Sequence, residues 1–583
     1  MKNINLNVNG VDVTVPEGTR ILDAAIKAGF KVPTLCYMKD LCNESSCRIC
    51  VVEIKNNRKL MTACSTVVSE GMEVFTNTPK VRASRKITLE LMLSNHHKDC
   101  LSCVRSGNCE LQALATEYGC DAEKYAGAMN DYDVDQATEY LIRDNNKCIL
   151  CRRCVAACNK VQTVGVIDAG NRGFATRIAS PFEKSLGEVP CVACGQCINV
   201  CPTGALREKD SVKDVEKLLA DPSKTVIVGT APSVRAALGE EFGYKIGTDT
   251  EGKMVAALKA IGFDKVFDVD MAADMTIMEE GAEFISRLND PNAVFPMITS
   301  CSAGWIRFIE FNYPELLPNL SSCKSPQQMF GAIMKTYYAK KNGLDPKNVA
   351  VVTVMPCIAK KFELTRDDEC AAGNGIPDID ASITTRELAR MIKNYGIDFA
   401  ALDPKAQFDD PIGKGSTAGL IFGATGGVME AALRTVAETV TGETLANVDF
   451  KAVRGTKGIK EATITLAGKT LNICVASGLG NARKIMDDIK AGKSKYHFIE
   501  IMACPGGCVN GGGQPIVKSE TRNLVDVAKV RASVLYKKDK KDELRKCHEN
   551  PVVKTLYAEF FEKPNSHIAH KTLHTSYVKR DRY

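Results

Sequence analysis

The chain lacks the long apolar segments of a membrane protein. Its 583 residues contain no run of eighteen consecutive apolar side chains, which is about the minimum for a transmembrane helix. The first residues, Met1-Lys2-Asn3-Ile4-Asn5, enter an alternating polar pattern at once and show no apolar core of a signal peptide. We therefore expect a cytoplasmic protein without a membrane span.

A glycine-rich dinucleotide-binding turn, placed after a strand and before a helix, is also absent from the sequence. The chain should therefore not bind NAD or flavin itself. The formal charge of +6 counts every cysteine as neutral. A cluster held by four thiolates carries about two net negative charges, so several clusters would bring the total below zero. The charge therefore does not indicate nucleic-acid binding.

Cysteine is the residue present in excess. The chain has 25 cysteines, while its 45% hydrophobic and 25% charged content is ordinary for a globular protein. In a cytoplasmic protein this number indicates metal or redox chemistry rather than disulfides. The spacing C-x-x-C recurs along the chain, which supports metal binding. The length predicts three to five domains, in a multidomain α+β and α/β protein.

Residues 1–79 are predicted to form a β-grasp domain that holds a 2Fe–2S cluster. Apolar residues alternate with polar ones over 4–15, around a favoured hairpin turn at Asn9-Gly10. Thr19 is expected to cap the helix that follows. The spacing C-x10-C-x2-C-x13-C suits a 2Fe–2S cluster, with a zinc knuckle as the alternative and Cys42 as a competing thiol. The expected ligands are Cys36, Cys47, Cys50 and Cys64.

Residues 80–125 include the pattern H-x3-C-x2-C-x5-C. One imidazole and three thiols can hold either zinc or a 4Fe–4S cluster. The neighbouring electron-transfer motifs favour iron, while His97 competes with His96 for the imidazole position. The expected ligands are His96, Cys100, Cys103 and Cys109.

Residues 126–210 carry a repeated pattern, C-x2-C-x2-C-x3-C, whose second copy is followed by Pro202. This is the signature of a two-cluster bacterial ferredoxin, in which the fourth cysteine of each run binds the other cluster. One 4Fe–4S cluster is therefore assigned to Cys148, Cys151, Cys154 and Cys201. The second is assigned to Cys191, Cys194, Cys197 and Cys158.

From residue 211 onwards helices alternate with short apolar strands, as at 226–229 and 349–354. This pattern predicts an α/β domain over 211–530, in two lobes with its active groups at strand ends facing a cleft. Three segments in it hold cysteines in tight contexts: 299–305, 355–363 and 502–513. The last has five glycines around its two thiols. So little side-chain bulk lets the backbone approach a large inorganic group.

These three segments resemble the signature segments of the iron-only, or FeFe, hydrogenases. The N-terminal part resembles the accessory region of the long clostridial forms, which also matches part of respiratory complex I. The resemblance implies an H-cluster: a 4Fe–4S cluster bridged by one cysteine to a diiron subsite bearing CO, cyanide and an azadithiolate. It implies Cys357, Cys504 and Cys508 as ligands of the cluster, with Cys508 as the bridge.

The first segment departs from the family pattern. The family has two adjacent cysteines and a proline before the tryptophan, the first a proton donor and the second a cluster ligand. Here the residues are Cys301-Ser302-Ala303. Either Ser302 binds as an alkoxide, or Cys301 shifts to bind and the relay is altered. Because thiolate suits iron–sulfur clusters much better than serine oxygen, we expect Cys301 to be the ligand.

A proton route is expected along one helix face. Glu280, Glu283 and Arg287 share that face by periodicity, a pattern also typical of a solvated charged surface. The resemblance implies that Glu280, Ser321 and Glu283 conduct protons, with Arg287 near the exit.

The resemblance also implies groups that hold the diiron unit. It assigns hydrogen bonding of the cyanides to Lys360 and to Ser233, which follows Pro232. Met355 and Met502 match the family's packing residues, whose thioethers would give CO ligands apolar walls. From the sequence alone, it is equally possible that both methionines are ordinary core residues.

The remaining features are expected to be structural. We expect residues 531–583 to form a tail like the small subunit of the family, charged and solvated from Lys537. His567 to His574 should form a surface helix rather than a metal site. Six cysteines have no assigned ligand role, and most should be buried apolar residues: Cys42, Cys120, Cys323, Cys370, Cys474 and Cys547.

The expected activity is therefore the reversible conversion of protons and electrons to H2. Expected partners are ferredoxin, flavin- and cluster-bearing subunits that bind NAD(P) in an electron-bifurcating complex, and maturation proteins. The alternatives are a free-standing ferredoxin hydrogenase, or a hydrogen-sensing or electron-relay subunit with little turnover. Oxygen lability is expected from the family's iron chemistry, as suits an anaerobe.

Overall fold

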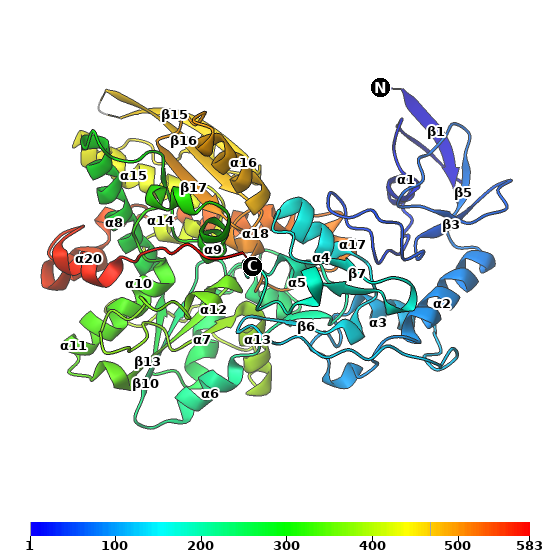
Figure 1. Cartoon of the computed structure of the whole chain (residues 1–583), viewed down its shortest axis with the longest axis horizontal. Helices are drawn as coiled ribbons and strands as arrows, with labels where there is room; N and C mark the ends of the chain where they lie inside the picture. Colours follow the sequence, from blue (N-terminus) through cyan, green and yellow to red (C-terminus); the bar gives the residue numbers. More distant parts are fainter. Residues whose placement is uncertain (1, 467, 583) are drawn as a thin grey trace.

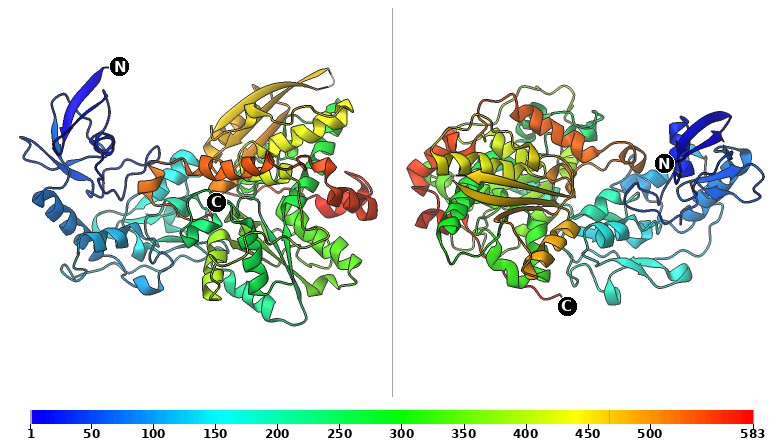
Figure 2. Two further views of the ribbon diagram at one scale, coloured as in Figure 1. Left: turned by 180° about the vertical axis from the view of Figure 1, so that it is seen from behind. Right: turned by 90° about the horizontal axis from the view of Figure 1, so that it is seen from above.

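The computed structural model describes residues 2–466 and 468–582. A large body is formed by the C-terminal two-thirds of the chain, and the N-terminal domains extend from one side of it (Figures 1 and 2). The first sheet lies at the far end, and the helices and loops of residues 80–210 lie between it and the large body. The first domain also contacts the large body directly, where the Lys39 amide donates to the Asn523 side-chain oxygen at 2.8 Å.

The first domain has the predicted hairpin. Strands β1 (Asn3–Val8) and β2 (Val11–Pro16) pair antiparallel, with Val8 opposite Val11. The five-stranded sheet has the order β2-β1-β5-β3-β4 and packs on α1 (Ile21–Lys27). The prediction that Thr19 caps α1 is wrong, because Arg20 holds the N-cap position and the Thr19 hydroxyl donates to the Pro16 carbonyl instead. The other strands are β3 (Val51–Ile54), β4 (Met61–Thr62) and β5 (Glu73–Phe75).

Residues 80–210 are mostly loops held by short elements. The antiparallel pairs β6–β9 and β7–β8 are the only sheets that the described part of this region forms. Long loops are expected where buried thiols rather than a large core hold the chain together. The elements are α2 (Pro79–Leu93), α3 (Glu110–Glu117), β6 (Leu141–Arg143), α4 (Arg153–Ala156), β7 (Asp168–Gly170), β8 (Arg177–Ala179), α5 (Gln196–Val200) and β9 (Leu206–Glu208).

The large body contains two four-stranded sheets, as the predicted two lobes require. The first, β11-β10-β13-β14, is entirely parallel, and every residue of β13 (Val349–Met355) is buried. Such continuous apolar strands are typical of parallel sheets covered on both faces. The second sheet has the order β12-β17-β16-β15, with only β15 antiparallel. The remaining strands are β10 (Thr225–Thr230), β11 (Lys265–Asp268), β12 (Met297–Ile298), β14 (Ala381–Thr384), β15 (Ile459–Leu466), β16 (Lys469–Ser477) and β17 (Phe498–Met502).

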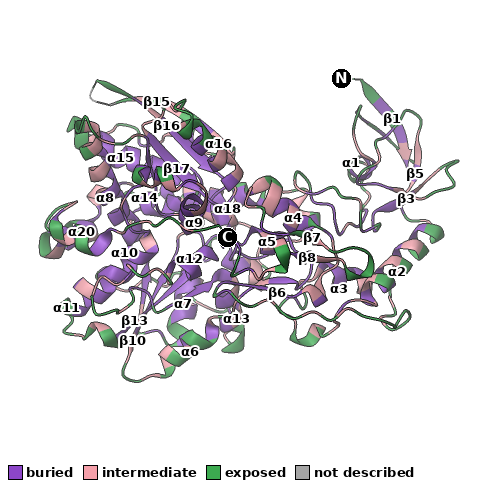
Figure 3. Cartoon of the chain, in the orientation of Figure 1, coloured by how far each residue is buried: buried purple, intermediate pink, exposed green. Residues whose placement is uncertain are grey.

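Helices cover both sheets, and their inner faces form the buried core of the large body (Figure 3). The longest is α8, which spans Asp270–Asn289 and carries the predicted proton route. The others are α6 (Val212–Ala220), α7 (Glu251–Ile261), α9 (Ala303–Asn312), α10 (Pro326–Ile333), α11 (Ala339–Lys341), α12 (Ala359–Glu363), α13 (Thr385–Asn394), α14 (Thr417–Leu420), α15 (Gly427–Thr441), α16 (Leu479–Lys490), α17 (Ser519–Arg522), α18 (Val527–Asp539), α19 (Pro551–Leu556) and α20 (His567–Leu573).

The C-terminal tail is packed beyond a short exposed run, which corrects the prediction of a solvated segment: Lys537, Lys540 and Lys541 are exposed, but later residues such as Leu556 and Phe561 are buried. Asp539 at the end of α18 is buried and accepts hydrogen bonds from Arg434. Helix α20 buries Leu573, and the next residue, His574, is also buried. The sequence is locally rich in charge, but its apolar positions face the core at helical spacing, and this favours packing over solvation. Among the described residues, no helix combines the length and the apolar character needed to cross a membrane.

One buried arginine connects the four predicted domains. Arg153 donates to the Glu110 carboxylate at 3.1 Å, to the Tyr37 carbonyl at 3.1 Å and to the Ser519 hydroxyl at 3.0 Å. Burial alone would raise the pKa of Glu110, but the charge of Arg153 holds this pKa below its usual range. Each partner comes from a different domain, so this contact fixes how the N-terminal domains dock on the large body.

We expect the Arg153→Ala variant to lose about 3–5 kcal/mol of stability, because it leaves the Glu110 carboxylate buried and unpaired. Anaerobic thermal denaturation would measure the loss, and limited proteolysis would show earlier release of the N-terminal domains. The Arg172→Ala variant, which changes an exposed arginine of the same domain, is the matched control. Equal stability of the two variants would contradict this role.

Candidate active site and cluster-binding sites

The two ferredoxin-like thiol sets lie around two separate cavities. Cys148, Cys151, Cys154 and Cys201 line one of them. Cys158, Cys191, Cys194 and Cys197 line the other. The exchange of the fourth cysteine between the two runs therefore corresponds to the geometry. The ligand assignments themselves stay predictions.

The loops around these cavities share an unusual backbone. Leu150 and Arg152 in the first run have positive φ angles, as do Ala193 and Gly195 in the second. Left-handed backbone at non-glycine residues is costly, so it persists where the surrounding structure imposes it. Burial raises the pKa of Cys148 to about 12. A metal must therefore displace the thiol proton, which couples metal binding to the chemistry of these loops.

The β-grasp thiols form two contacting pairs. The Cys36 amide donates to the Cys47 sulfur at 3.4 Å, and Cys50 and Cys64 interact through their side chains. All four are buried. Cys42 does not join them, because its thiol donates to the Cys151 carbonyl at 3.8 Å, in the ferredoxin-like domain. The competing thiol of the sequence is thus directed away from the four predicted ligands.

His96 and His97 have different surroundings. His96 is buried, and its Nδ1 has no hydrogen-bond partner among the described residues. Burial lowers the pKa of His96 to about 4, so the ring is neutral and able to bind a metal. His97 lies 3.9 Å from the Asp131 carboxylate instead. An unpaired buried imidazole nitrogen fits a metal or cluster ligand and favours His96 over His97.

A fifth site lies at the carboxyl ends of the parallel strands in the large body. Strand β13 leads to Cys357, β17 leads to Cys504 and Cys508, and β12 leads to Cys301. All four thiols line one cavity, whose wall is mostly apolar. Polar groups at strand ends of an α/β fold are the usual place for a ligand site. Sulfurs from three distant segments are thus brought together as the sequence predicts.

The glycines of segment 502–513 include Gly507 and Gly511, which line the central cavity, and some of them also allow close backbone packing. A Cβ on Gly511 would lie 2.1 Å from the Pro356 carbonyl oxygen, and one on Gly512 would lie 2.6 Å from the Cys194 carbonyl oxygen. These glycines are required because backbone packs on backbone there. They therefore also join the three cysteine segments and the ferredoxin-like domain.

Cys301 and Ser302 both line the central cavity. The Cys301 thiol is buried, and besides burial the charges of Glu280 and Cys508 raise its pKa. The Ser302 hydroxyl accepts from the Ala503 amide at 3.2 Å. Cys301 therefore lies between the acidic helix face and the other thiols, a position that suits both a cluster ligand and a proton donor. Its assignment as the cluster ligand stays a prediction.

The groups predicted to hold the diiron unit also line this cavity, namely Pro232, Ser233, Met355, Lys360 and Met502. The Ser233 hydroxyl is buried without a hydrogen-bond partner among the described residues. The Lys360 ammonium bonds both oxygens of Glu363 at 2.9–3.0 Å and the Cys301 carbonyl at 3.2 Å. An unpaired hydroxyl and an ammonium at an apolar cavity fit a bound group that carries hydrogen-bond acceptors.

The predicted proton route is continuous at its outer end. The Arg287 guanidinium bonds Glu283 at 2.6 Å, and the Ser321 hydroxyl donates to the same carboxylate at 3.1 Å. Glu280 is buried, and neither of its carboxylate oxygens has a hydrogen-bond partner among the described residues. Burial, together with the nearby charge of Glu283, raises the pKa of Glu280 to about 8. The solvated-face alternative is therefore wrong for Glu280.

Two features of the site escaped the sequence analysis. Glu363 positions Lys360, and the i,i+3 spacing on α12 was the available signal. Cys194 lines both the second ferredoxin-like cavity and the central cavity. No sequence pattern predicts that Cys194 reaches the central cavity, because this depends on how two domains dock.

The paired thiols of the first domain, the two ferredoxin-like cavities and the central cavity together define an iron–sulfur redox protein with several clusters. Family models match most of the chain: the C-terminal domain of the large subunit of iron only hydrogenase (224–512), the iron hydrogenase small subunit (525–580) and a 2Fe-2S cluster binding domain (1–79). An NADH-ubiquinone oxidoreductase-G iron-sulfur binding region matches 85–124, and a 4Fe-4S dicluster domain matches 147–205.

Curated relatives and solved structures agree with these matches. The chain is 49% identical to the NADP-reducing hydrogenase subunit HndD of Solidesulfovibrio fructosivorans over 100% of both chains. It is 45% identical to iron hydrogenase 1 of Clostridium pasteurianum, over 98% of this chain and 99% of that one. A variant of the FeFe-hydrogenase HydA1 from Chlamydomonas reinhardtii matches with a TM-score of 0.57 and 41% identity, over 64% of this chain and 100% of that one. The chain belongs to the iron-only hydrogenase family.

We expect the Cys301→Ala variant to lose the 4Fe–4S cluster of the central cavity, because the oxygen of the neighbouring Ser302 is a poor substitute for the missing thiolate at iron. The Ser302→Ala variant should keep the cluster. Electron paramagnetic resonance of the reduced proteins, with iron counted per chain, would distinguish them. Loss of the cluster in Ser302→Ala and its retention in Cys301→Ala would contradict the assignment of Cys301.

We expect the Glu280→Gln variant to gain stability relative to the parent protein as the pH rises. Because burial raises the pKa of Glu280 from 4.5 to about 8, the folded state holds this proton more tightly than the unfolded state. The parent therefore loses about 1.4 kcal/mol per pH unit between these two values. Glutamine has no such proton to lose. Anaerobic thermal denaturation at pH 5 to 8 would measure this effect, and a difference independent of pH would contradict it.

Proposed function

We propose that this chain catalyses the reversible reaction 2H+ + 2e− ⇌ H2 at the central cavity. The observation that supports it most directly is the meeting of Cys301, Cys357, Cys504 and Cys508 at one cavity. A thiol-lined cavity for a second cluster adjoins it on one side, and a buried acid with a raised pKa lies near Cys301. A hydrogenase needs a metal centre, a supply of electrons and a supply of protons, and these three features would provide them.

The proposed cofactors are one 2Fe–2S cluster, three accessory 4Fe–4S clusters and an H-cluster. In the H-cluster, Cys508 joins the 4Fe–4S part to a diiron subsite with CO, cyanide and an azadithiolate. When bound, this group supplies the redox and acid–base chemistry that forms or splits H2. Lys360 and Ser233 would donate hydrogen bonds to the cyanides, while Met355 and Met502 would supply the apolar wall.

The proposed proton route runs from the central cavity beside Cys301 through Glu280, Ser321 and Glu283 to Arg287. Glu280 is suited to this task because a pKa of about 8 lets it take up and release a proton near neutral pH. The Ser321 hydroxyl and the Glu283 carboxylate are already hydrogen bonded. Arg287 is partly exposed and holds Glu283 at the surface end. The route therefore leads from the interior to solvent along α8.

The proposed electron route has two entrances that converge. The Cys42 thiol of the β-grasp domain contacts the Cys151 carbonyl, beside the first ferredoxin-like cavity. The His96 domain reaches the same cavity, because Arg105 donates to the Cys201 carbonyl at 2.8 Å. From there Cys194 leads to the central cavity. Electrons from either entrance would pass through the ferredoxin-like pair.

The partners that we propose are ferredoxin and, in a larger complex, flavin- and cluster-bearing subunits that bind NAD(P). The full-length similarity to a subunit of an NADP-reducing hydrogenase supports the multisubunit, electron-bifurcating form. Maturation proteins would deliver the diiron unit. A free-standing hydrogenase is the second candidate, supported by the similarity to iron hydrogenase 1 over nearly the whole chain.

The test uses fully matured protein prepared without oxygen. Infrared bands from carbonyl and cyanide groups, together with H2 evolution from a reduced dye, are expected. Their absence would sink the proposal, and bands without turnover would favour a sensor or relay subunit, which the unusual Ser302 would then explain.

For the proton route, we expect Glu280→Gln to lower H2 evolution by about 100-fold or more while the infrared bands persist, since a positioned acid–base group typically contributes about 10²–10⁴-fold. Glu279→Gln is the matched control. Glu279 neighbours Glu280 and is equally buried, but its carboxylate bonds the Tyr557 hydroxyl and the His574 ring rather than Ser321 or Arg287. Near-normal turnover in Glu280→Gln would refute the route.

A further inference from the structure

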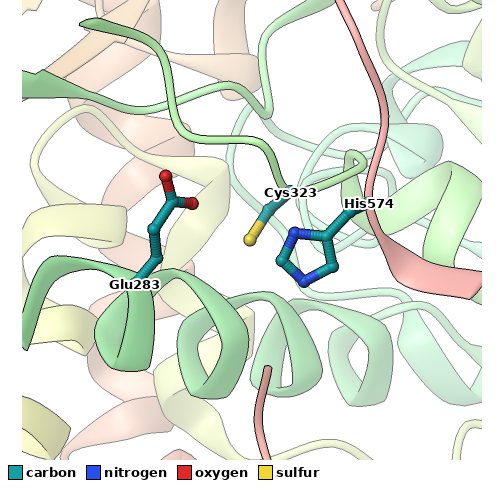
Figure 4. Close-up of side chains that lie close together, drawn as sticks. All are labelled: Glu283, Cys323 and His574. Carbon is teal, nitrogen blue, oxygen red and sulfur yellow. The ribbon is translucent and has the colours of Figure 1, made fainter. Parts of the chain in front are cut away.

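Three potential metal ligands meet beside the outer end of α8. A carboxylate oxygen of Glu283, the sulfur of Cys323 and a ring nitrogen of His574 all lie within 4.8 Å of one another. The Glu283 carboxylate and the His574 ring lie on either side of the Cys323 sulfur (Figure 4). A carboxylate, a thiolate and an imidazole are the ligand types that zinc and similar divalent cations bind.

The backbone holds two of these residues together. Cys323 and His574 form an antiparallel bridge. Hydrogen bonds run on both sides of it, from the Lys324 amide to the Leu573 carbonyl and from the Thr575 amide to the Ser322 carbonyl, each at 2.8 Å. The closing segment of the chain therefore brings His574 to Cys323 in a defined register. The separation of the two side chains does not depend on a flexible loop.

The His574 ring is oriented as in many metal sites. Its Nε2 bonds the buried Glu279 carboxylate at 3.1 Å. Metal-binding histidines commonly place the second ring nitrogen against a carboxylate in this way. Among the described residues, Nδ1 hydrogen-bonds only the rotatable hydroxyl of Ser322, at 2.8 Å, and that hydroxyl also donates to Glu283 at 3.2 Å. A polar position between the two would-be ligands therefore exists, and the hydroxyl can turn away from it.

We propose that Glu283, Cys323 and His574 bind a single borderline-soft divalent cation such as Zn²⁺, with water as the fourth ligand. Binding releases the Cys323 thiol proton to solvent. The carboxylates of Glu279 and Glu283 offset the charge of the cation and of Arg287. Glu283 is partly exposed, and the exposed His570 stacks on His574 with ring centroids 3.9 Å apart. The site is therefore reachable from the surface.

The cation closes the proton route, an effect that rests on the proposed function of Glu283. A carboxylate held by a metal does not exchange protons with Ser321, and the added positive charge repels an arriving proton. Turnover should therefore fall while the central metal centre stays assembled. The site gives the protein a means of inhibition by metal that acts on protons and leaves electron transfer intact.

Zn²⁺ added to the matured, chelator-washed holoenzyme tests this inference. We expect a single additional zinc per chain, with one sulfur and one imidazole in its X-ray absorption spectrum. Cys323→Ala should bind it at least about 100-fold more weakly, since changes to even the outer partners of a metal site cost about 10–100-fold. Cys474→Ala, which changes an equally buried cysteine outside the cluster, is the matched control and should bind zinc normally.

The same titration is followed by H2 evolution and infrared spectroscopy. Zinc should inhibit the parent and Cys474→Ala at the concentrations at which it binds, without altering the infrared bands. Unchanged zinc affinity in Cys323→Ala, or a zinc spectrum without sulfur, overturns the site. Zinc bound with sulfur but without inhibition overturns the proton role of Glu283 and leaves the site standing. If Cys323→Ala fails to assemble, His574→Ala takes its place with the same expected loss of affinity.

Discussion

The convergence of buried parallel strands on one cavity is the constraint on which the rest of this structure depends. Strands β10, β13, β12 and β17 belong to two different sheets, yet the residues that follow each of them line the same cavity. Because parallel strands are covered on both faces, polar and metal-binding groups can be placed only at their ends. The close backbone approach at Gly511 and Gly512 then locks the two sheets and the ferredoxin-like domain around that point.

Burial sets the chemistry of the groups around the cavity. It raises the pKa values of Cys357, Cys504 and Cys508, so that these thiols are neutral unless a metal binds them. It acts on Glu280 in the same direction, since an ionised carboxylate is disfavoured away from water. The apolar wall that suits an organometallic group is therefore also what makes a buried glutamate a usable proton donor near neutral pH.

Much of this arrangement could be predicted from the sequence because metal ligands occur at short, characteristic spacings. The two ferredoxin-like sets and the strands before Cys357 were readable in this way. The rest depends on contacts between distant segments, which spacing does not record. The prediction for Thr19 failed because a local hydrogen bond to Pro16 competes with capping. The prediction for the tail failed because its helices bury apolar residues that lie between charged ones in the sequence. His574 lies beside Cys323 only after the whole of the intervening chain has folded.

The proposed paths of electrons and protons use different residues. Cys194 connects the central cavity with the ferredoxin-like domain, whereas Glu280 and Glu283 leave it along α8 in the large body. Separate routes allow each supply to be controlled on its own, since a change at Glu283 does not touch the thiol-lined cavities. Arg153 holds the N-terminal domains, which would carry the electrons, in place on the large body. In the proposed function, the groups that supply protons and those that supply electrons would therefore reach one cavity without sharing a residue.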